Sequence, residues 1–255
     1  YEFYSSRVDI EGFPYTIWRR IYKEVLTEDN NELLQIGHSQ GDRNLREAIN
    51  NYLRFSRGVN TKIDNIIIGA GTEYLIQIII NILGRNKRFS VEEPGYYKIK
   101  KILKINGVNP IPISIDNQGV NVDRLRESNS EVIHITPSHQ FPTGIIMPIN
   151  RRIQILNWAN ESKGRYIIED DYDSELRLGG KPIPTLQSID VSDKIIYMNT
   201  FTKTLSSTIR MSYMVLPESL ADEYYKRLSF YSCTVSNFEQ YTLSRFIENG
   251  HFERH

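Results

Sequence analysis

Short apolar runs rich in β-branched residues alternate with longer segments of helical periodicity from about residue 60 onward. This alternation is typical of a mostly parallel sheet with helices on both faces. We therefore predict a three-layer α/β/α fold around a seven-stranded, mostly parallel sheet. The expected strands are 65–69, 88–92, 109–113, 132–136, 166–170, 195–199 and 212–216, and the expected helices include 72–83, 97–105, 151–162 and 220–228.

The first 58 residues have a different pattern. Helical periodicity at 15–26 and 44–55 is separated by Gly37, Gly41 and polar residues. We expect residues 1–58 to form a helical N-terminal arm that packs on a large domain made of residues 59–255. The chain starts at a tyrosine and ends in a segment with helical periodicity, so we expect it to be a fragment.

The composition excludes several classes of partner. The 31 acidic and 31 basic side chains balance, so no net charge favours nucleic acid or an anionic membrane. No apolar run reaches the length of a membrane span, because Gln77 and Asn81 interrupt the longest one. Cys233 is the single cysteine, which excludes an internal disulfide and fits the reducing cytoplasm.

Polar residues directly after the predicted strands are candidate ligand-binding residues, because open α/β sheets bind ligands beyond the carboxyl ends of their strands. The first such segment is the glycine turn Gly69-Ala70-Gly71-Thr72-Glu73, which begins an apolar helix. Its N–H groups and the helix dipole suit a phosphate. A dinucleotide site is an alternative, since Glu92 and Glu93 follow at a suitable spacing, but Tyr74 occupies the position of the third glycine.

Two further strand ends carry an aromatic ring and a cluster of acids. Tyr96 follows a turn after the strand 88–92, where a core position is the alternative interpretation. The strand 166–170 ends in Glu169 and Asp170, and Asp171 follows directly. Buried carboxylates need a cation, a metal or a protonated ring nearby. No histidine or cysteine has the spacing of a metal ligand to this cluster.

The last informative strand end leads through Thr200 to Lys203, and Arg210 follows seven residues later. A single lysine is usually a solvated surface residue, but this combination meets the needs of pyridoxal 5′-phosphate (PLP). An amine forms the Schiff base, a carboxylate keeps the pyridinium nitrogen protonated, and cationic and backbone donors hold the phosphate. The sequence therefore predicts PLP bound covalently to Lys203.

Three segments resemble the aminotransferase-like effector domain of the MocR/GabR family of bacterial transcription regulators, which has the fold of fold-type I PLP enzymes. They are the segments 136–144 (TPSHQFPTG), 169–175 (EDDYDSE) and 200–203 (TFTK). The resemblance implies that Asp170 pairs with the pyridinium nitrogen, that Tyr172 binds the phenolic oxygen and that Tyr96 stacks on the ring. The phosphate ligands that it implies are Gly71, Thr72, the backbone N–H of Glu73, Thr200 and Arg210.

The chain also departs from the general aminotransferase pattern. Phe141 stands where many aminotransferases have an asparagine, and Ile36 stands where many have a tyrosine that reaches the neighbouring subunit. Lys98 follows Tyr96 closely and is either an effector contact or a solvated lysine.

The resemblance further implies a homodimer that senses a small amino compound or PLP itself. In the family, DNA is bound by an N-terminal winged-helix domain, and a C-terminal small domain completes the fold; we expect both to lie outside this chain. A class I/II aminotransferase remains the alternative, because Lys203 and Asp170 would serve either function. The segments 138–141 and 169–175 resemble the regulators more closely.

Overall fold

The computed structural model describes residues 12–27, 31–173 and 184–255, and a mixed sheet forms the middle of this part of the chain. The strand order is β1-β8-β7-β6-β5-β2-β3-β4. The strands are β1 (Ile66–Gly69), β2 (Phe89–Glu93), β3 (Ile111–Asp116), β4 (Gly119–Val120), β5 (Val132–Ile135), β6 (Tyr166–Asp170), β7 (Ile195–Thr200) and β8 (Ser212–Val215).

The α/β prediction is confirmed, but the predicted number of strands was wrong. The described sheet has eight strands rather than seven. The additional strand is β4, which has two residues and pairs antiparallel with β3 through Ile115–Val120 and Asp116–Gly119. A strand this short shows no side-chain alternation in the sequence. Strand β8 is antiparallel to both β1 and β7, and the other long strands pair in parallel.

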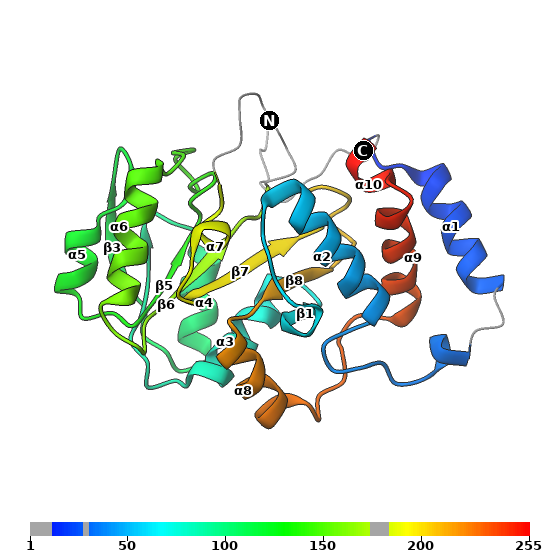
Figure 1. Ribbon diagram of the computed structural model, residues 1–255, viewed down its shortest axis with the longest axis horizontal. Coiled ribbons are helices and arrows are strands. Elements are labelled where there is room, and N and C mark those ends of the chain that lie inside the picture. Colours follow the sequence, from blue (N-terminus) through cyan, green and yellow to red (C-terminus); the bar gives the residue numbers. More distant parts are fainter. Residues whose placement is uncertain (1–11, 28–30, 174–183) are drawn as a thin grey trace.

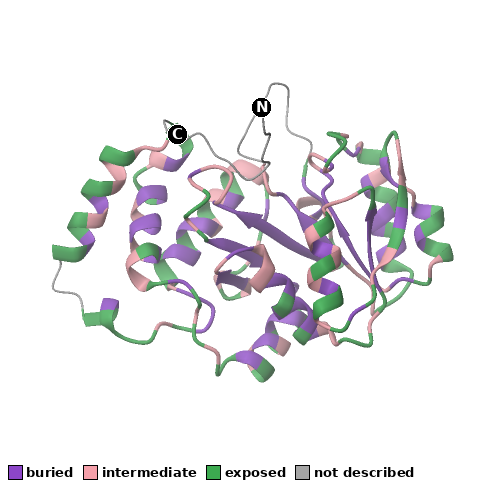
Figure 2. Ribbon diagram, turned by 180° about the vertical axis from the view of Figure 1, so that it is seen from behind, coloured by how far each residue is buried: buried purple, intermediate pink, exposed green. Residues whose placement is uncertain are grey.

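Helices cover both faces of the sheet (Figure 1). One face packs against α3 (Thr72–Leu83), α4 (Tyr97–Ile105) and α8 (Glu218–Leu228). The other packs against α2 (Arg43–Arg57), α5 (Val122–Glu127), α6 (Ile149–Asn160) and α7 (Leu186–Ile189). The strands are buried almost throughout, whereas the outer helices expose one side (Figure 2). Neighbouring residues of a strand therefore enter different cores, as Ile66 and Ile67 do.

The N-terminal helices share a core with the last helices of the chain. Helix α1 (Tyr15–Thr27) packs beside α9 (Asn237–Glu248), where the rings of Trp18 and Phe246 are 5.5 Å apart (Figure 1). Helix α2 lies between the sheet and these helices and contributes Leu45, Ile49 and Leu53 to the same apolar cluster. The short helices η1 (Asn31–Leu34), η2 (Ile63–Asn65) and α10 (His251–Arg254) complete the described elements. The arm boundary at residue 58 stays a prediction.

No helix among the described residues is both long enough and apolar enough to span a membrane.

Candidate functional site

A cavity of about 490 Å³ lies beyond the carboxyl ends of β6 and β7, next to the first turn of α3. All nine site residues predicted from the sequence line it, so the structure brings them together in one place. They are Gly71, Thr72, Glu73, Tyr96, Asp170, Tyr172, Thr200, Lys203 and Arg210. Their individual roles stay predictions. Two further residues line the same cavity. They are Phe141, which departs from the general aminotransferase pattern, and Lys98, for which the sequence left two interpretations.

Asp170 is held in place by a histidine from the neighbouring strand. Nε2 of His134, on β5, lies 3.1 Å from Oδ2 of Asp170 at the end of β6, and both residues are buried. The hydrogen bond fixes the orientation of a carboxylate that lines the cavity. His134 was not among the residues predicted from the sequence, because a single histidine inside an apolar strand is usually a core residue.

Lys203 has the protonation bias that a nucleophilic amine needs. Burial lowers the pKa of its ammonium group, Asp173 opposes this shift, and Lys98 adds to it. A lower pKa increases the fraction of neutral amine, which is the nucleophilic form. Tyr172 lines the same cavity and donates its hydroxyl proton to the backbone oxygen of His139 at 3.1 Å. Its hydroxyl oxygen can still accept a hydrogen bond from a ligand.

The first turn of α3, which lines the cavity, has features that suit an anion. Gly71 precedes the helix with φ of 91°, a value that favours glycine, and it supplies no side-chain cap for the first N–H groups. A β-carbon at Gly71 would lie 2.7 Å from Nη2 of Arg210. Thr200 adds a hydroxyl that accepts from Ser212 at 2.8 Å and donates to Thr202 at 2.8 Å. These residues fit a phosphate group.

An aromatic pair forms a wall of the cavity. The rings of Tyr96 and Phe141 are 5.4 Å apart at 76°, an edge-to-face contact. The loops that carry them are joined by Glu92 and Gln140. Glu92 accepts from the N–H of Thr136 at 3.1 Å, and Gln140 donates to the backbone oxygen of Pro94 at 2.9 Å. Burial raises the pKa of the Glu92 carboxyl above its ordinary value. Hydrogen bonds from Thr136 oppose this shift but do not cancel it.

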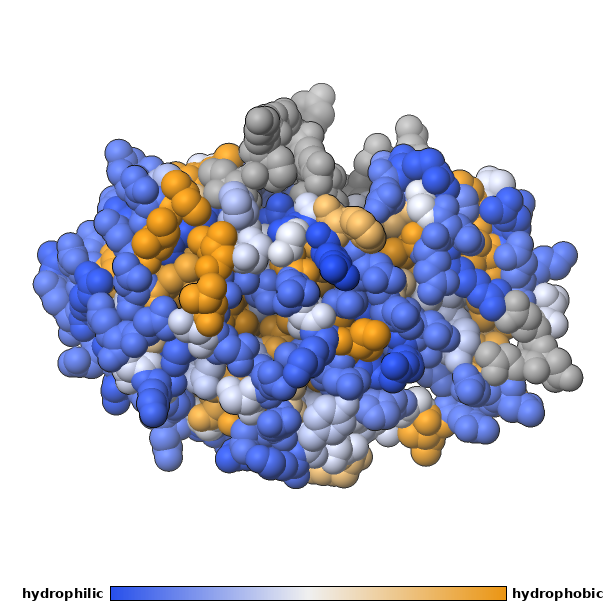
Figure 3. Space-filling model, in the orientation of Figure 1, coloured by the Kyte–Doolittle hydropathy of each residue, from blue (hydrophilic) through white to orange (hydrophobic). Residues whose placement is uncertain are grey.

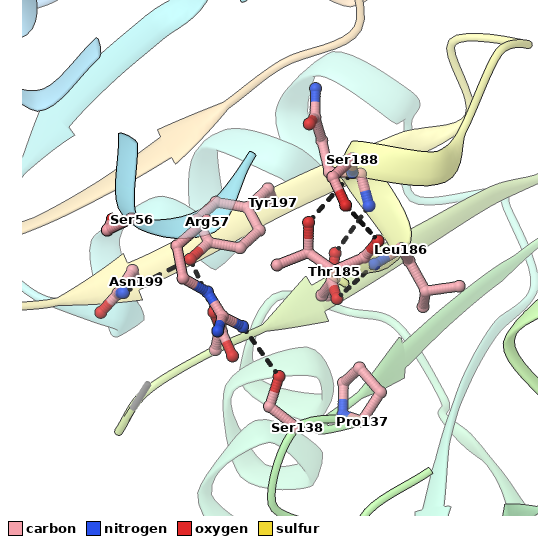
Figure 4. Close-up of polar contacts among 12 residues, drawn as sticks. Ser56, Arg57, Pro137, Ser138, Thr185, Leu186, Ser188, Tyr197 and Asn199 are labelled. Carbon is pink, nitrogen blue, oxygen red and sulfur yellow. Dashed lines mark hydrogen bonds and ion pairs between the residues drawn. The ribbon is translucent and has the colours of Figure 1, made fainter. Parts of the chain in front are cut away.

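The predicted acidic cluster is divided between the two sides of β6. Only Asp170 lines the cavity. Asp171 accepts from Tyr197 at 2.7 Å and pairs with Arg57 at 2.8 Å, and both charged side chains are almost inaccessible. Burial alone lowers the pKa of Arg57, but Asp171, Tyr197 and Glu169 together outweigh this effect and the pKa is raised. Figure 4 shows Arg57 extending from α2 past Tyr197 towards Ser138, to which it donates at 3.2 Å.

Glu169 faces a second buried arginine. Nη1 of Arg152 lies 3.4 Å from its carboxylate, and the N–H groups of Leu186 and Gln187 donate to it at 2.8 and 3.0 Å. Burial and the nearby Asp171 raise its pKa to about 7. The cations that the cluster predicted are therefore two arginines on one side of β6, whereas Asp170 points to the cavity. Ser174 and Glu175, which end the predicted motif, lie outside the described residues.

Comparison with known proteins defines the class. Residues 12–254 match the model of the aminotransferase class I and II family, and the chain belongs to this family. The chain is also similar to solved members: it superposes on a kynurenine aminotransferase of Pyrococcus horikoshii, crystallised in complex with PMP, with a TM-score of 0.86 and 26% identity over 98% of this chain and 64% of that one.

The more similar relatives are transcription regulators. The chain is 41% identical over 254 residues to the uncharacterized HTH-type transcriptional regulator YdeL of Bacillus subtilis, covering 100% of this chain and 55% of YdeL. It is 32% identical to the probable rhizopine catabolism regulatory protein MocR of Rhizobium meliloti, covering 99% of this chain and 51% of MocR. These relatives confirm the predicted resemblance to MocR/GabR-type regulators. The chain spans about half the length of the relatives that it matches.

Proposed function

We propose that this chain is the PLP-binding, effector-sensing part of a transcription regulator of the MocR/GabR type. One observation carries the proposal: Lys203, Asp170 and the uncapped first turn of α3 border a single cavity, in a chain that aligns along its whole length with HTH-type regulators. The family of the chain and the PMP-bound neighbour support PLP as the cofactor.

The residues of the cavity divide the work of holding PLP. Bound PLP supplies an electrophilic carbon and an electron-withdrawing ring. The neutral amine of Lys203 is the nucleophile for covalent attachment. Asp170, oriented by His134, holds the proton on the ring nitrogen. Thr72 and Glu73 bind the phosphate through their N–H groups, together with the side chains that reach the same end, Thr200 and Arg210.

The same proposal includes the partners of the protein. The effector is a small amino compound or PLP itself, the protein acts as a homodimer in the cytoplasm, and DNA is bound by a segment outside this chain. The HTH-type names of the similar regulators support the DNA-binding role.

The first experiment is an absorbance spectrum of the full-length protein with PLP, followed by borohydride reduction and peptide mapping. We expect a visible band, and an adduct trapped on Lys203. Lys98→Ala is the matched control, because Lys98 lines the same cavity. This variant should still form the adduct on Lys203. Lys203→Ala should abolish the adduct, and a reducible adduct at this site in Lys203→Ala would refute the assignment.

A class I/II aminotransferase is the second candidate, favoured by the similarity to the kynurenine aminotransferase of P. horikoshii. The two functions differ in turnover and in DNA binding. We expect the full-length protein to bind DNA and to change its DNA affinity when an amino compound is added. Many turnovers of amino-group transfer to a 2-oxo acid, without DNA binding, would instead assign the protein to the enzymes.

A further inference from the structure

An ion pair occupies the phosphate end of the cavity. Nη2 of Arg210 donates to Oε2 of Glu73 at 2.7 Å, and the two side chains are about half exposed, at 52% and 42%. Both groups lie directly over Gly71, because a β-carbon there would be 2.7 Å from Arg210 and 2.8 Å from Glu73. The carboxylate of Glu73 therefore lies where the first turn of α3, Gly71 and Arg210 form an anion site.

A carboxylate and a phosphate at this position would use the same donors. The guanidinium group binds either anion, and the helix N-terminus attracts either one. A phosphate that binds Arg210 must break its contact with Glu73 or share the guanidinium group with it. Sharing brings two negative groups together, which weakens the binding of the second.

We infer that Glu73 is an affinity-setting residue of the phosphate subsite: its carboxylate competes with the cofactor phosphate for Arg210 and limits the preference of the site for PLP over pyridoxal. The inference rests on the proposed function, because it requires that PLP binds in this cavity. It gives the side chain of Glu73 a role separate from that of its backbone N–H, which remains a phosphate donor. A site of reduced phosphate affinity would respond to changes in PLP concentration.

The decisive comparison uses PLP and pyridoxal, which differ only in the phosphate. Glu73→Gln removes the charge and keeps the size of the side chain. Since an exposed ion pair contributes up to about 1 kcal/mol, we expect the Kd for PLP to fall about three- to fivefold in the full-length variant. The Kd for pyridoxal should change by less than about twofold on the same scale. Both are measured by absorbance titration of the band formed at Lys203.

A control replaces a glutamate of another exposed ion pair, away from the cavity. Glu127 pairs with Arg124 at 3.0 Å on α5, and Glu127→Gln should leave both dissociation constants unchanged. In the background Arg210→Gln, Glu73→Gln should improve PLP binding by less than it does in the unsubstituted protein, because the competition for the guanidinium group is missing. A gain of undiminished size in that background would show charge repulsion alone and would overturn the competition.

The outcomes separate this inference from the proposed function. If Glu73→Gln leaves PLP affinity unchanged or weakens it, Glu73 orients Arg210 rather than competing for it, and the inference fails while the cofactor assignment stands. If the unsubstituted full-length protein forms no band with either ligand, the proposed function fails and the inference falls with it.

Discussion

At the scale of single residues, the hydrogen bond between His134 and Asp170 connects a buried strand residue to the cofactor site. His134 is not among the residues that line the cavity. Its effect on a ligand must therefore pass through the carboxylate of Asp170. A hydrogen bond to a charged group contributes about 1.5–3 kcal/mol. We expect His134→Leu to weaken PLP binding by about 10- to 100-fold, as measured by absorbance titration.

A second substitution separates positioning from packing. Gln can donate a hydrogen bond to Asp170, so His134→Gln should recover much of the PLP affinity, and its spectrum should stay closer to that of the unsubstituted protein. If His134→Leu and His134→Gln lose the same affinity, the role of His134 is packing of the strand rather than orientation of the carboxylate.

At the scale of elements, the sequence predicted local structure better than partners across the fold. The predicted helices 72–83 and 97–105 have the bounds of α3 and α4, because apolar periodicity and flanking glycines are local signals. The predicted site residues also meet, since parallel strands bring their carboxyl ends to one edge. No local signal in the sequence predicts the pairing of Arg57 with Asp171, because it joins α2 to the end of a strand more than a hundred residues later.

The buried pair of Arg57 and Asp171 connects the end of α2 to the end of β6, next to Asp170. Removing one partner leaves a buried charge without compensation, at a cost of about 3–5 kcal/mol. We therefore expect Arg57→Met to lower the free energy of unfolding by about this amount, as measured by urea denaturation. The hydroxyl of Tyr197 and the hydrogen bond to Ser138 contribute to the same contact.

The double variant Arg57→Met/Asp171→Asn provides the control, because it removes both charges. It should be more stable than Arg57→Met alone, since no unpaired carboxylate remains in the core. A loss below about 1 kcal/mol in Arg57→Met would match an exposed pair and would contradict the burial of this one.

At the scale of the whole molecule, apolar side chains on the surface indicate where further chains or segments contact the described core. The face seen in Figure 3 is mainly hydrophilic, with apolar side chains gathered beside α6. Ile149 and Ile153 are four residues apart on α6, at the spacing of one helix face, and are 42% and 47% exposed, while Ile146 in the preceding loop is 56% exposed. Leu34 and Ile36, between α1 and α2, are more exposed, at 80% and 87%.

We predict that the full-length protein is a homodimer whose interface includes Leu34 and Ile36. Ile36 stands where many aminotransferases have a tyrosine that reaches the neighbouring subunit, and burial of two large aliphatic side chains contributes about 1.5–3 kcal/mol each. The double variant Leu34→Glu/Ile36→Glu would place carboxylates in that interface. We expect its dimer dissociation constant to rise by at least about 100-fold in analytical ultracentrifugation.

Two comparisons make this prediction specific. Val191 is 97% exposed in the loop before β7, so Val191→Glu controls for the general effect of an added surface charge and should leave the dimer intact. Ile149→Glu/Ile153→Glu tests the apolar face of α6. Dissociation by the α6 variant alone would move the interface to that helix, whereas a dimer that survives Leu34→Glu/Ile36→Glu would exclude the segment between α1 and α2.

Because fold-type I sites lie near a subunit boundary, dissociation by the Leu34/Ile36 variant should also weaken PLP binding, which the same absorbance titration would detect.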